Sequence, residues 1–371
     1  MTKVRVLYVI SDMGIGGAQK QVAEVMTRLD HDRFDTDLVC IETGGVNLEK
    51  VRGLGETFIL NALRIYDNHG LAALARLASI IRRGRYDIVE TYLPDAHFLC
   101  SGLLLGRRKP LLVASRRHMA SLDPAWMTAV SPLLDASTRF SIANSRAVKN
   151  SISARYHISP SKIAVIPNAV GVPANAPDRR AARASFGICD GQYVVAAAAS
   201  ITPVKDYPTI IRAFAQLCAP RDAVLLIAGD GHSRASVVSC AKDLGLNGQV
   251  RFLGTVPDVA PVLSAADVFV HASLSEGFPN AILEAMAAGL PVVSSDIPSS
   301  REALGDCGLF FKPSDPAGCL AGLEAFTSTQ LASVHGTKAR TRVQDNFGDK
   351  VITRRERLYE NLVRITNANC Y

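Results

Sequence analysis

The chain has 371 residues, of which 48% are hydrophobic and 20% are charged, with 27 Gly and 18 Pro. This composition excludes disordered, collagen-like and low-complexity proteins, and a typical domain size of about 150 residues predicts two domains. The net charge of +7 lies within residues 1–170, which hold 22 Lys and Arg against 15 Asp and Glu, while the rest of the chain holds 19 of each. One basic domain beside a neutral one favours an anionic surface or ligand at the first domain over nucleic acid.

The cysteines stand singly along the chain, at Cys40, Cys100, Cys189, Cys218, Cys240, Cys307, Cys319 and Cys370. Because none forms a CxxC pair, we expect reduced, mostly buried thiols and neither zinc nor disulfides. Val4–Ile10 is too short for a signal-peptide core, and no uncharged apolar run reaches the roughly 18–20 residues of a membrane span. The sequence therefore predicts a cytoplasmic protein, soluble or peripheral at the inner face of the membrane.

In the first half of the chain, short apolar runs alternate with amphipathic segments. Strands are predicted at Val4–Ile10, Asp37–Ile41, Asp87–Thr91, Leu111–Ser115, Phe140–Ala143 and Ile163–Pro167. Helices are predicted at Gln19–Leu29, at Leu71–Arg82, and from a cap at Asn144 or Ser145 to about Arg155. Strands that alternate with helices of this length indicate a parallel sheet built from βαβ units.

The same pattern restarts after Asn168–Pro177, a stretch of Gly, Pro, Ala and Asn that is predicted to be a linker. Further strands are predicted at Tyr193–Ala199, Val224–Gly229, Val250–Leu253, Val268–Ala272 and Pro291–Ser294, and helices at Thr209–Leu217, Ser233–Leu244 and about 279–288. The two runs predict an α/β fold of two doubly wound, Rossmann-like domains, residues 1–170 and 171–345, facing each other across a cleft.

The last segment, 346–371, is predicted to form an amphipathic helix that packs on the outside, back toward the first domain. Its charged residues are expected on one side of that helix: Arg354, Arg355, Glu356, Arg357 and Glu360.

The segment 275–286 is the strongest candidate for a functional site. A predicted strand leads through a turn into a helix that begins near Pro279 and ends before Gly289, where proline and glycine are favoured. The start of such a helix offers backbone N–H groups and the positive end of its dipole to a phosphate. Glu276 before the helix and Glu284 inside it suit the hydroxyls of two sugars, one at each end of a diphosphate. Either glutamate alone is more often a solvated charge, but the complete strand-turn-helix favours function.

Glu276 and Glu284, followed by Ala285-Met286-Ala287-Ala288-Gly289-Leu290-Pro291-Val292-Val293, resemble the signature of family-four retaining glycosyltransferases of GT-B fold. The resemblance covers essentially the whole chain. It includes Gly14-Ile15-Gly16-Gly17-Ala18-Gln19 (the first glycine loop), Ile166-Pro167-Asn168 (the interdomain junction), Pro203-Val204-Lys205-Asp206 (the donor-phosphate lysine) and Ala228-Gly229-Asp230-Gly231 (the fourth-strand turn). The combination is specific for this family, whereas any one of these segments alone would be weak evidence.

The resemblance implies a nucleoside-diphosphate sugar, with UDP or GDP, as donor and co-substrate. No cofactor is implied, and no metal is needed if the protein's cations suffice. Glu284 would bind the ribose and Glu276 the donor sugar. The diphosphate would be held by Lys205 and by backbone N–H groups of the segment Gly277, Phe278, Asn280 and Ala281. The resemblance also places Arg251 near the base, His118 near donor sugar and acceptor, and Gly16 and Gly17 where backbone approaches the reacting centre.

One position of the donor site departs from the family. An arginine is expected five residues before Lys205, where this chain has Ser200. The missing cation weakens stabilisation of the leaving group unless another residue supplies it, and Arg116, Arg117 and Arg301 are candidates. The departure bears more on the identity of the donor than on the class of reaction.

Two further motifs favour structural interpretations. Gly14 and Gly16 could begin a dinucleotide fingerprint, but Gln19 replaces the third glycine. The Asp-x-Asp strings at 30–32 and 35–37 are similar to a metal chelator, yet they lie between the first helix and the second strand, at the wrong edge of the sheet for ligands. They are predicted to form a solvated turn.

Isolated histidines and basic clusters are less specific signals. His97, His232 and His271 are each more often structural, although His271 ends a strand at the carboxyl edge and could line the donor site. Basic clusters in the first domain fit either contact with an anionic membrane surface or unrelated surface turns, at Arg82-Arg83-Arg85, Arg107-Arg108-Lys109 and Arg116-Arg117.

Together with these residues, the resemblance implies a transferase that moves a hexosyl or N-acetylhexosaminyl group to a hydroxyl of a glycan or lipid-linked acceptor, in polysaccharide or lipopolysaccharide biosynthesis. Lys205 and the helix N–H groups would stabilise the departing diphosphate by a few kcal/mol per donor. Retention of configuration would follow the family, with His118 positioning the reactants rather than acting as a base. Two alternatives stay open. A sugar-nucleotide epimerase of the same fold lacks an obvious acid–base cluster, while Ser200 is compatible with an inactive nucleotide-sugar-binding protein.

Overall fold

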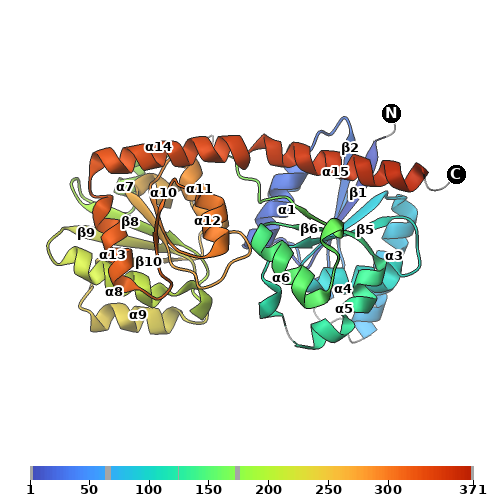
Figure 1. Ribbon diagram of the computed structural model, residues 1–371, viewed down its shortest axis with the longest axis horizontal. Coiled ribbons are helices and arrows are strands. Elements are labelled where there is room, and N and C mark those ends of the chain that lie inside the picture. Colours follow the sequence, from blue (N-terminus) through green and yellow to red (C-terminus); the bar gives the residue numbers. More distant parts are fainter. Residues whose placement is uncertain (1–2, 63–67, 124, 172–175, 369–371) are drawn as a thin grey trace. The chain divides into compact units, whose positions relative to one another are not determined.

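The computed structural model describes residues 3–62, 68–123, 125–171 and 176–368, which form two compact units (Figure 1). The first unit comprises Met1–Ala169 and Asp349–Tyr371, and the second comprises Val170–Gly348. Residues 172–175 of the predicted linker and Cys370 lie outside the described residues. The linker prediction starts too early, because Ala169 is buried in the first unit and exchanges hydrogen bonds of 2.7 and 2.9 Å with the Gln21 side chain.

The first unit is built on a parallel sheet of seven strands in the order β3-β2-β1-β4-β5-β6-β7. The strands are β1 (Val4–Ile10), β2 (Phe34–Cys40), β3 (Thr57–Ile59), β4 (Ile88–Tyr92), β5 (Leu111–Arg116), β6 (Thr138–Ala143) and β7 (Ile163–Val165). The helices are α1 (Gly17–Arg28), α2 (Leu48–Val51), α3 (Asn68–Gly84), α4 (Pro94–Leu104), α5 (Ala125–Ser137), α6 (Arg146–Tyr156) and α15 (Asp349–Ala368). The strand order reverses between β1 and β4, and doubly wound sheets bind ligands at the carboxyl ends beside such a reversal.

The C-terminal helix α15 buries a different face from the one predicted. Val351, Arg355 and Tyr359 are buried and, at a spacing of four residues, share one side of the helix. Arg355 is 1% exposed, and its guanidinium pairs with the fully buried Glu90 carboxylate of β4. The prediction that Arg355 and Glu356 lie with the other charges on one outer side is therefore wrong, because both are buried against partners far away in the sequence, Arg355 against Glu90 and Glu356 against Arg33.

The second unit has a parallel sheet of six strands in the order β10-β9-β8-β11-β12-β13. The strands are β8 (Tyr193–Ala198), β9 (Ala223–Ala228), β10 (Val250–Gly254), β11 (Val268–His271), β12 (Val292–Ser295) and β13 (Leu309–Phe311). The helices are α7 (Arg179–Ser185), α8 (Tyr207–Cys218), α9 (Arg234–Asp243), α10 (Ala260–Ala265), α11 (Asn280–Ala287), α12 (Pro298–Leu304), α13 (Pro316–Ala325) and α14 (Thr329–Asn346). Here the order reverses between β8 and β11.

Apolar side chains cover both faces of the second sheet, which explains why its strands are almost continuously hydrophobic. All six residues of β9 are buried. Alternate residues of β8 belong to different clusters: Val195 packs with Phe214 of α8, whereas Val194 belongs to the cluster of Ile282 of α11. Burial of α8 and α11 on opposite faces fixes where the loops before these helices emerge.

Two predictions about the strands differ from the structure. No strand is predicted at β3 or β13, which have only three residues each and lie at the edges of their sheets. The segment 35–37 is predicted to be a solvated turn but lies within β2. Its Asp37 carboxylate accepts hydrogen bonds of 2.7 Å from the Tyr86 hydroxyl and from the Glu56 N–H, so it has a structural partner on each oxygen.

Candidate functional site

Two charged residues meet at the reversal point of the second sheet. Lys205 ends a short 3-10 turn that follows β8, and Glu276 follows β11. The Lys205 ammonium donates to Glu276 Oε1, and the two side chains are only 18% and 14% exposed. Because β8 and β11 are neighbours, residues 71 positions apart come together at the edge where such sheets bind ligands.

Three donors fix one oxygen of the Glu276 carboxylate. Besides the Lys205 ammonium, Ser273 Oγ lies 2.8 Å and His271 Nε2 lies 3.2 Å from Oε1. Burial raises the pKa of Glu276, but the hydrogen bond from His271 and the charge of Lys205 outweigh it and lower the pKa from 4.5 to about 2. Within the described part of the chain, Oε2 accepts no hydrogen bond. The carboxylate is thus ionised and fixed, with one oxygen available to a ligand.

The lowered pKa of Glu276 predicts how stability depends on pH. Since the pKa is about 2 in the folded protein and near its ordinary value of 4.5 when unfolded, the carboxylate stabilises the fold above pH 4.5. This contribution is lost as the pH falls toward 2. We therefore expect the melting-temperature difference between the parent and Glu276→Gln to shrink between pH 5 and pH 2.5. A difference that stays constant over this range would contradict the assigned ion pair.

Helix α11 begins directly after this ion pair. Its N-cap is Pro279, in extended conformation, and no side chain caps the helix from that position. Proline has no N–H, and first-turn N–H groups of a helix lack partners in a preceding turn, so this end suits an anion. The two residues before Pro279, Gly277 and Phe278, are buried, and the rings of Phe278 and Phe347 pack with their centroids 5.5 Å apart. Glu284 lies one turn inside the helix and is partly exposed.

Two glycines fix the loop after β8 that carries Lys205. A Cβ on Gly229 would lie 1.9 Å from a backbone oxygen of this loop, and a Cβ on Gly231 would lie 2.4 Å from another. Gly229 also has a φ of +146°, which residues with a Cβ rarely adopt. The N–H of Ile201 donates to the Asp230 carbonyl at 2.9 Å. The glycines after β9 therefore allow the close backbone contact that positions the lysine loop.

Other predicted donor-site residues make different contacts. Ser200 is exposed. Arg301, a candidate for the missing cation, forms a two-pronged ion pair with Asp296, in which Nη2 and Oδ2 are 2.7 Å apart. Arg251 donates to the backbone carbonyls of residues 186 and 187 at the end of α7. Both guanidinium groups thus have partners within the protein, and the role predicted for Arg251 at the base stays a prediction.

In the first unit, the loop after β1 closes tightly into α1. Gly16 is the N-cap and Gly17 is the first helical residue. A Cβ on Gly16 would lie 2.2 Å from Gln19 Oε1. The Gln19 amide donates to Asp12 Oδ2 at 3.2 Å, and Asp12 Oδ1 accepts from the Gly14 N–H at 2.6 Å. Gly16 therefore leaves room for a side-chain contact that shapes the loop, and its approach to a reacting centre stays a prediction.

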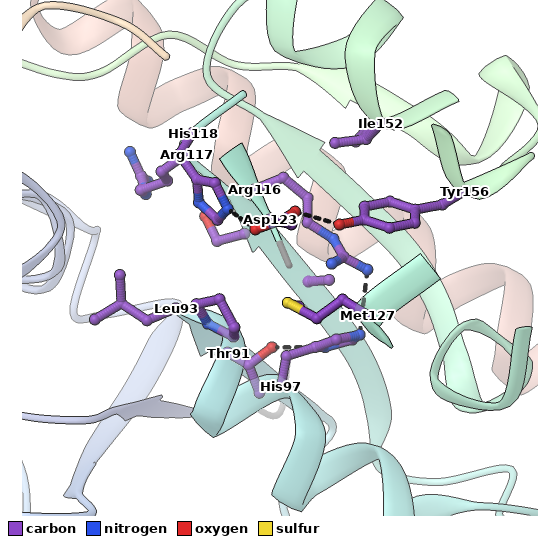
Figure 2. Close-up of a pocket in the computed structure, with 13 residues that line it drawn as sticks. Thr91, Leu93, His97, Arg116, Arg117, His118, Asp123, Met127, Ile152 and Tyr156 are labelled. Carbon is purple, nitrogen blue, oxygen red and sulfur yellow. Dashed lines mark hydrogen bonds and ion pairs between the residues drawn. The ribbon is translucent and has the colours of Figure 1, made fainter. Parts of the chain in front are cut away.

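A pocket lies beyond the carboxyl ends of β4 and β5 and is lined by His118 (Figure 2). His118 Nε2 is 2.5 Å from Asp123 Oδ1, and the other oxygen of Asp123 accepts from the Tyr156 hydroxyl. Burial raises the pKa of Asp123, but the hydrogen bonds from His118 and Tyr156 bring it below its ordinary value. The ionised carboxylate holds the His118 ring in one orientation, as a positioning role requires.

His97 and Arg116 line the same pocket. Arg116 Nη2 lies 3.0 Å from Asp135 Oδ1 and 3.2 Å from His97 Nε2, while His97 Nδ1 lies 3.2 Å from the Thr91 hydroxyl. Burial and the nearby Arg116 lower the pKa of His97 well below its ordinary value, so the ring is neutral and accepts at Nε2. Arg116 and Arg117 both line the pocket and are partly exposed, with 14% of the Arg116 side chain exposed, and their contact with a membrane surface stays a prediction.

Residues 3–62, 68–123, 125–171 and 176–368 contain neither a metal site nor a membrane-spanning helix. There, no group of three or more His, Cys, Asp or Glu side chains is placed to hold a metal ion. None of the helices in the same ranges combines the length and the apolar character that crossing a membrane requires. The seven described cysteines are free thiols, and five of them are buried.

Two family models match adjacent stretches of the chain. Residues 15–172 match Glycosyltransferase Family 4, and residues 178–344 match Glycosyl transferases group 1. The chain belongs to the group 1 glycosyltransferases. The predicted family is thereby confirmed, and so is the predicted fold class of two Rossmann-like α/β domains of GT-B type.

This glycosyltransferase is similar over most of its length to two bacterial enzymes and to one crystal structure. An N-acetyl-alpha-D-glucosaminyl L-malate synthase of Bacillus anthracis is 25% identical over 81% of each chain. A UDP-Gal:alpha-D-GlcNAc-diphosphoundecaprenol alpha-1,3-galactosyltransferase of Escherichia coli is 24% identical over 93% of this chain and 94% of its own. The crystal structure of Anabaena Alr3699/HepE in complex with UDP and glucose matches with a TM-score of 0.83 and 20% identity, over 97% and 99% of the two chains.

Several residues of the glycosyltransferase's candidate site were not predicted as partners. The sequence does not single out Ser273 and Asp123, because serine and aspartate are common in loops and only the folded structure identifies their partners. His271 was placed at the strand end as a residue that could line the donor site, but its hydrogen bond to Glu276 was not foreseen. The spacing His-x-Ser-x-x-Glu at the end of a strand is the available signal, since His271 ends β11 and the other two residues lie in the turn that follows.

Proposed function

We propose that this glycosyltransferase moves a hexosyl or N-acetylhexosaminyl group from a nucleoside-diphosphate sugar to a hydroxyl of a glycan or lipid-linked acceptor, with retention of configuration. The observation that carries the proposal is the Lys205–Glu276 ion pair at the sheet reversal, directly before α11. A departing diphosphate develops negative charge, which an ammonium and a helix N-terminus both stabilise.

Lys205 changes its partner when the donor binds. Without donor, its ammonium is neutralised by Glu276. The diphosphate brings further negative charge, so the Lys205 ammonium binds the diphosphate in addition to Glu276 or in place of it. Backbone N–H groups of the segment 277–281 also donate to the diphosphate. Ser273 and His271 continue to hold Glu276 Oε1, and Oε2 accepts a hydroxyl of the donor sugar. Glu284, one turn inside α11, binds the ribose hydroxyls.

Retention follows if the acceptor hydroxyl attacks the face from which the diphosphate leaves. The bond between the anomeric carbon and the diphosphate oxygen breaks, the bond to the acceptor oxygen forms, and a diphosphate oxygen takes the acceptor proton. No protein base is required in this scheme. His118, held by Asp123, orients the reactants, and Gly16 and Gly17 allow the backbone to come close to them.

Names of similar proteins support a nucleotide-sugar donor and a role in polysaccharide or lipopolysaccharide biosynthesis. The Escherichia coli relative is named for UDP-Gal as donor and for a diphosphoundecaprenol-linked acceptor. The Anabaena protein was crystallised with UDP and glucose. UDP is accordingly the first nucleotide to test, with GDP as the comparison.

Replacing the proposed ribose ligand should weaken nucleotide binding selectively. Hydrogen bonds to a charged group contribute about 1.5–3 kcal/mol, so Glu284→Ala should raise the Kd of the nucleoside diphosphate by roughly 10- to 100-fold. Isothermal titration with UDP and GDP measures this change. Glu324→Ala, on the exposed side of α13, is the matched control and should bind like the parent. Equal binding by Glu284→Ala and the parent would remove the ribose assignment.

The reaction class is tested with a panel of nucleotide sugars. The bound donor should raise the melting temperature, because ligand that binds only the folded state stabilises it. With that donor, release of free nucleoside diphosphate only when an acceptor is added supports the transferase. Interconversion of the donor without acceptor would instead indicate an epimerase, and binding without either reaction would indicate a nucleotide-sugar-binding protein.

The proposal includes peripheral contact with the inner face of the membrane. Arg82, Arg83, Arg107 and Arg108 are exposed, and Leu105 beside the second pair is 48% exposed. Each such cation contributes about 1 kcal/mol near an anionic lipid surface. Co-sedimentation with phosphatidylglycerol vesicles at low salt tests this contact. Equal binding of the parent and the combined Arg107→Gln and Arg108→Gln variant would contradict it.

A further inference from the structure

Arg117 is a cation without a carboxylate partner in the described part of the chain. It directly follows β5, and the acceptors of its hydrogen bonds are neutral: Nη1 donates to Asn168 Oδ1, and Nη2 lies 3.4 Å from the Tyr92 hydroxyl. The guanidinium carbon lies 4.7 Å from the centroid of the Tyr92 ring. Its Nε is buried and has no hydrogen-bond partner.

The surroundings of Arg117 do not neutralise its charge. The nearby carboxylate is Glu90, which is fully buried and already paired with Arg355. Burial raises the pKa values of Tyr92 and Tyr359 above the ordinary value, so these hydroxyls stay uncharged. One carboxylate therefore serves two guanidinium groups, which leaves an excess of one positive charge. Burial also lowers the pKa of Arg117, as expected for a charge removed from water without compensation.

The neighbouring Arg116 has a carboxylate partner, which is how a buried charge is usually compensated. Arg116 also lines the pocket, but its Nη2 lies 3.0 Å from Asp135 Oδ1. Arg117, labelled in Figure 2, lines the same pocket. Ser115 lines it too, and its Oγ is likewise buried without a hydrogen-bond partner. As a residue Arg117 is partly exposed, and its uncompensated positive charge together with the unpartnered Ser115 hydroxyl suits an anionic group of a ligand that enters this pocket.

We propose that Arg117 binds an anionic phosphoryl oxygen of a substrate, with Ser115 as a second donor. This inference rests on the proposed transferase function and deepens it, because it assigns a phosphate subsite to the first unit. The phosphoryl group belongs either to a phosphorylated acceptor or to the diphosphate of the donor. The chemistry is the same in both cases, since a guanidinium binds two phosphate oxygens at once.

The first test is stability without a bound anion. Arg117→Met keeps much of the apolar stem and removes the unpaired charge, so it should melt within about 2 °C of the parent in phosphate-free buffer. Arg139→Met is the matched control, because Arg139 is an exposed arginine of the same unit and lies outside the basic clusters. A variant that melts more than about 6 °C below the parent would show that Arg117 is a structural residue and would overturn the proposal.

The second test uses inorganic phosphate and UDP with the full-length chain. In one arm, phosphate is titrated into protein saturated with UDP, and the melting temperature is followed. In the other arm, the Kd of UDP is measured by titration calorimetry. If the subsite serves an acceptor, phosphate raises the melting temperature of the parent and of Arg139→Met but not of Arg117→Met, and the Kd of UDP is unchanged.

If the subsite serves the donor, Arg117→Met raises the Kd of UDP at least tenfold, and phosphate has no effect on the UDP-saturated proteins. Equal behaviour of Arg117→Met and the parent in both arms overturns the proposal. A parent that binds no UDP would count against the proposed function, whereas the phosphate arm would still decide whether Arg117 binds an anion.

Discussion

Lys205→Ala is expected to lower kcat by about 10²- to 10³-fold, with a smaller effect on the KM of the acceptor. The ammonium is proposed to stabilise charge that develops on the leaving diphosphate, and removing one such preorganised group typically costs this much. The loss should appear in kcat because the interaction is stronger in the transition state than with bound donor. Initial rates of nucleoside diphosphate release at saturating donor and acceptor measure it.

The control for this prediction is Lys242→Ala, which removes an exposed lysine of α9 in the same unit. It should keep the parent's kcat. Lys205→Arg should recover part of the activity, because it restores the charge with a different geometry. If Lys205→Ala kept kcat within threefold of the parent, the leaving-group role would be wrong and the ion pair with Glu276 would be purely structural.

Arg355→Met is expected to lower the free energy of unfolding by about 3–5 kcal/mol. The substitution removes one partner of a pair in which both side chains are at most 1% exposed, so that the Glu90 charge is left buried without compensation. The Tyr359 hydroxyl also donates to Glu90 and cannot supply a charge. Urea denaturation followed by circular dichroism measures the change as a lower midpoint.

Two variants separate the ion pair from general packing effects. Arg354→Met removes the adjacent, exposed arginine and should change the unfolding free energy by less than about 0.5 kcal/mol. Combining Arg355→Met with Glu90→Gln should be less destabilising than Arg355→Met alone, because the buried charge is removed as well. Additive losses in the double variant would argue against a coupled ion pair.

The fold could be predicted from local patterns because most of its strands are buried on both faces and therefore strongly apolar. β9 is an example, since all six of its residues are apolar and buried. The helix α11 could also be predicted, because Pro279 comes directly before it and Gly289 follows its end. The three-residue edge strands β3 and β13 were not predicted, whereas β7, which is equally short and also at an edge, was predicted as Ile163–Pro167, so length alone does not explain the difference.

The site was only partly predictable for a different reason. The spacing of Glu276 and Glu284 is a local feature of one turn and one helix, and the sequence contains it. That Lys205 pairs with Glu276 depends on β8 and β11 being neighbours, which is a property of the sheet order. Arg355 and Glu90 are 265 positions apart, so no pattern within α15 could show that this arginine is buried.

The central claim is that the diphosphate of the donor binds at the start of α11 against Lys205. A crystal structure of the full chain with UDP tests it most directly. We predict a phosphate oxygen at about 3 Å from Lys205 Nζ, and another at about 3 Å from a backbone nitrogen between Gly277 and Ala281. A diphosphate seated elsewhere, with the Lys205–Glu276 contact intact and the start of α11 unoccupied, would contradict the account.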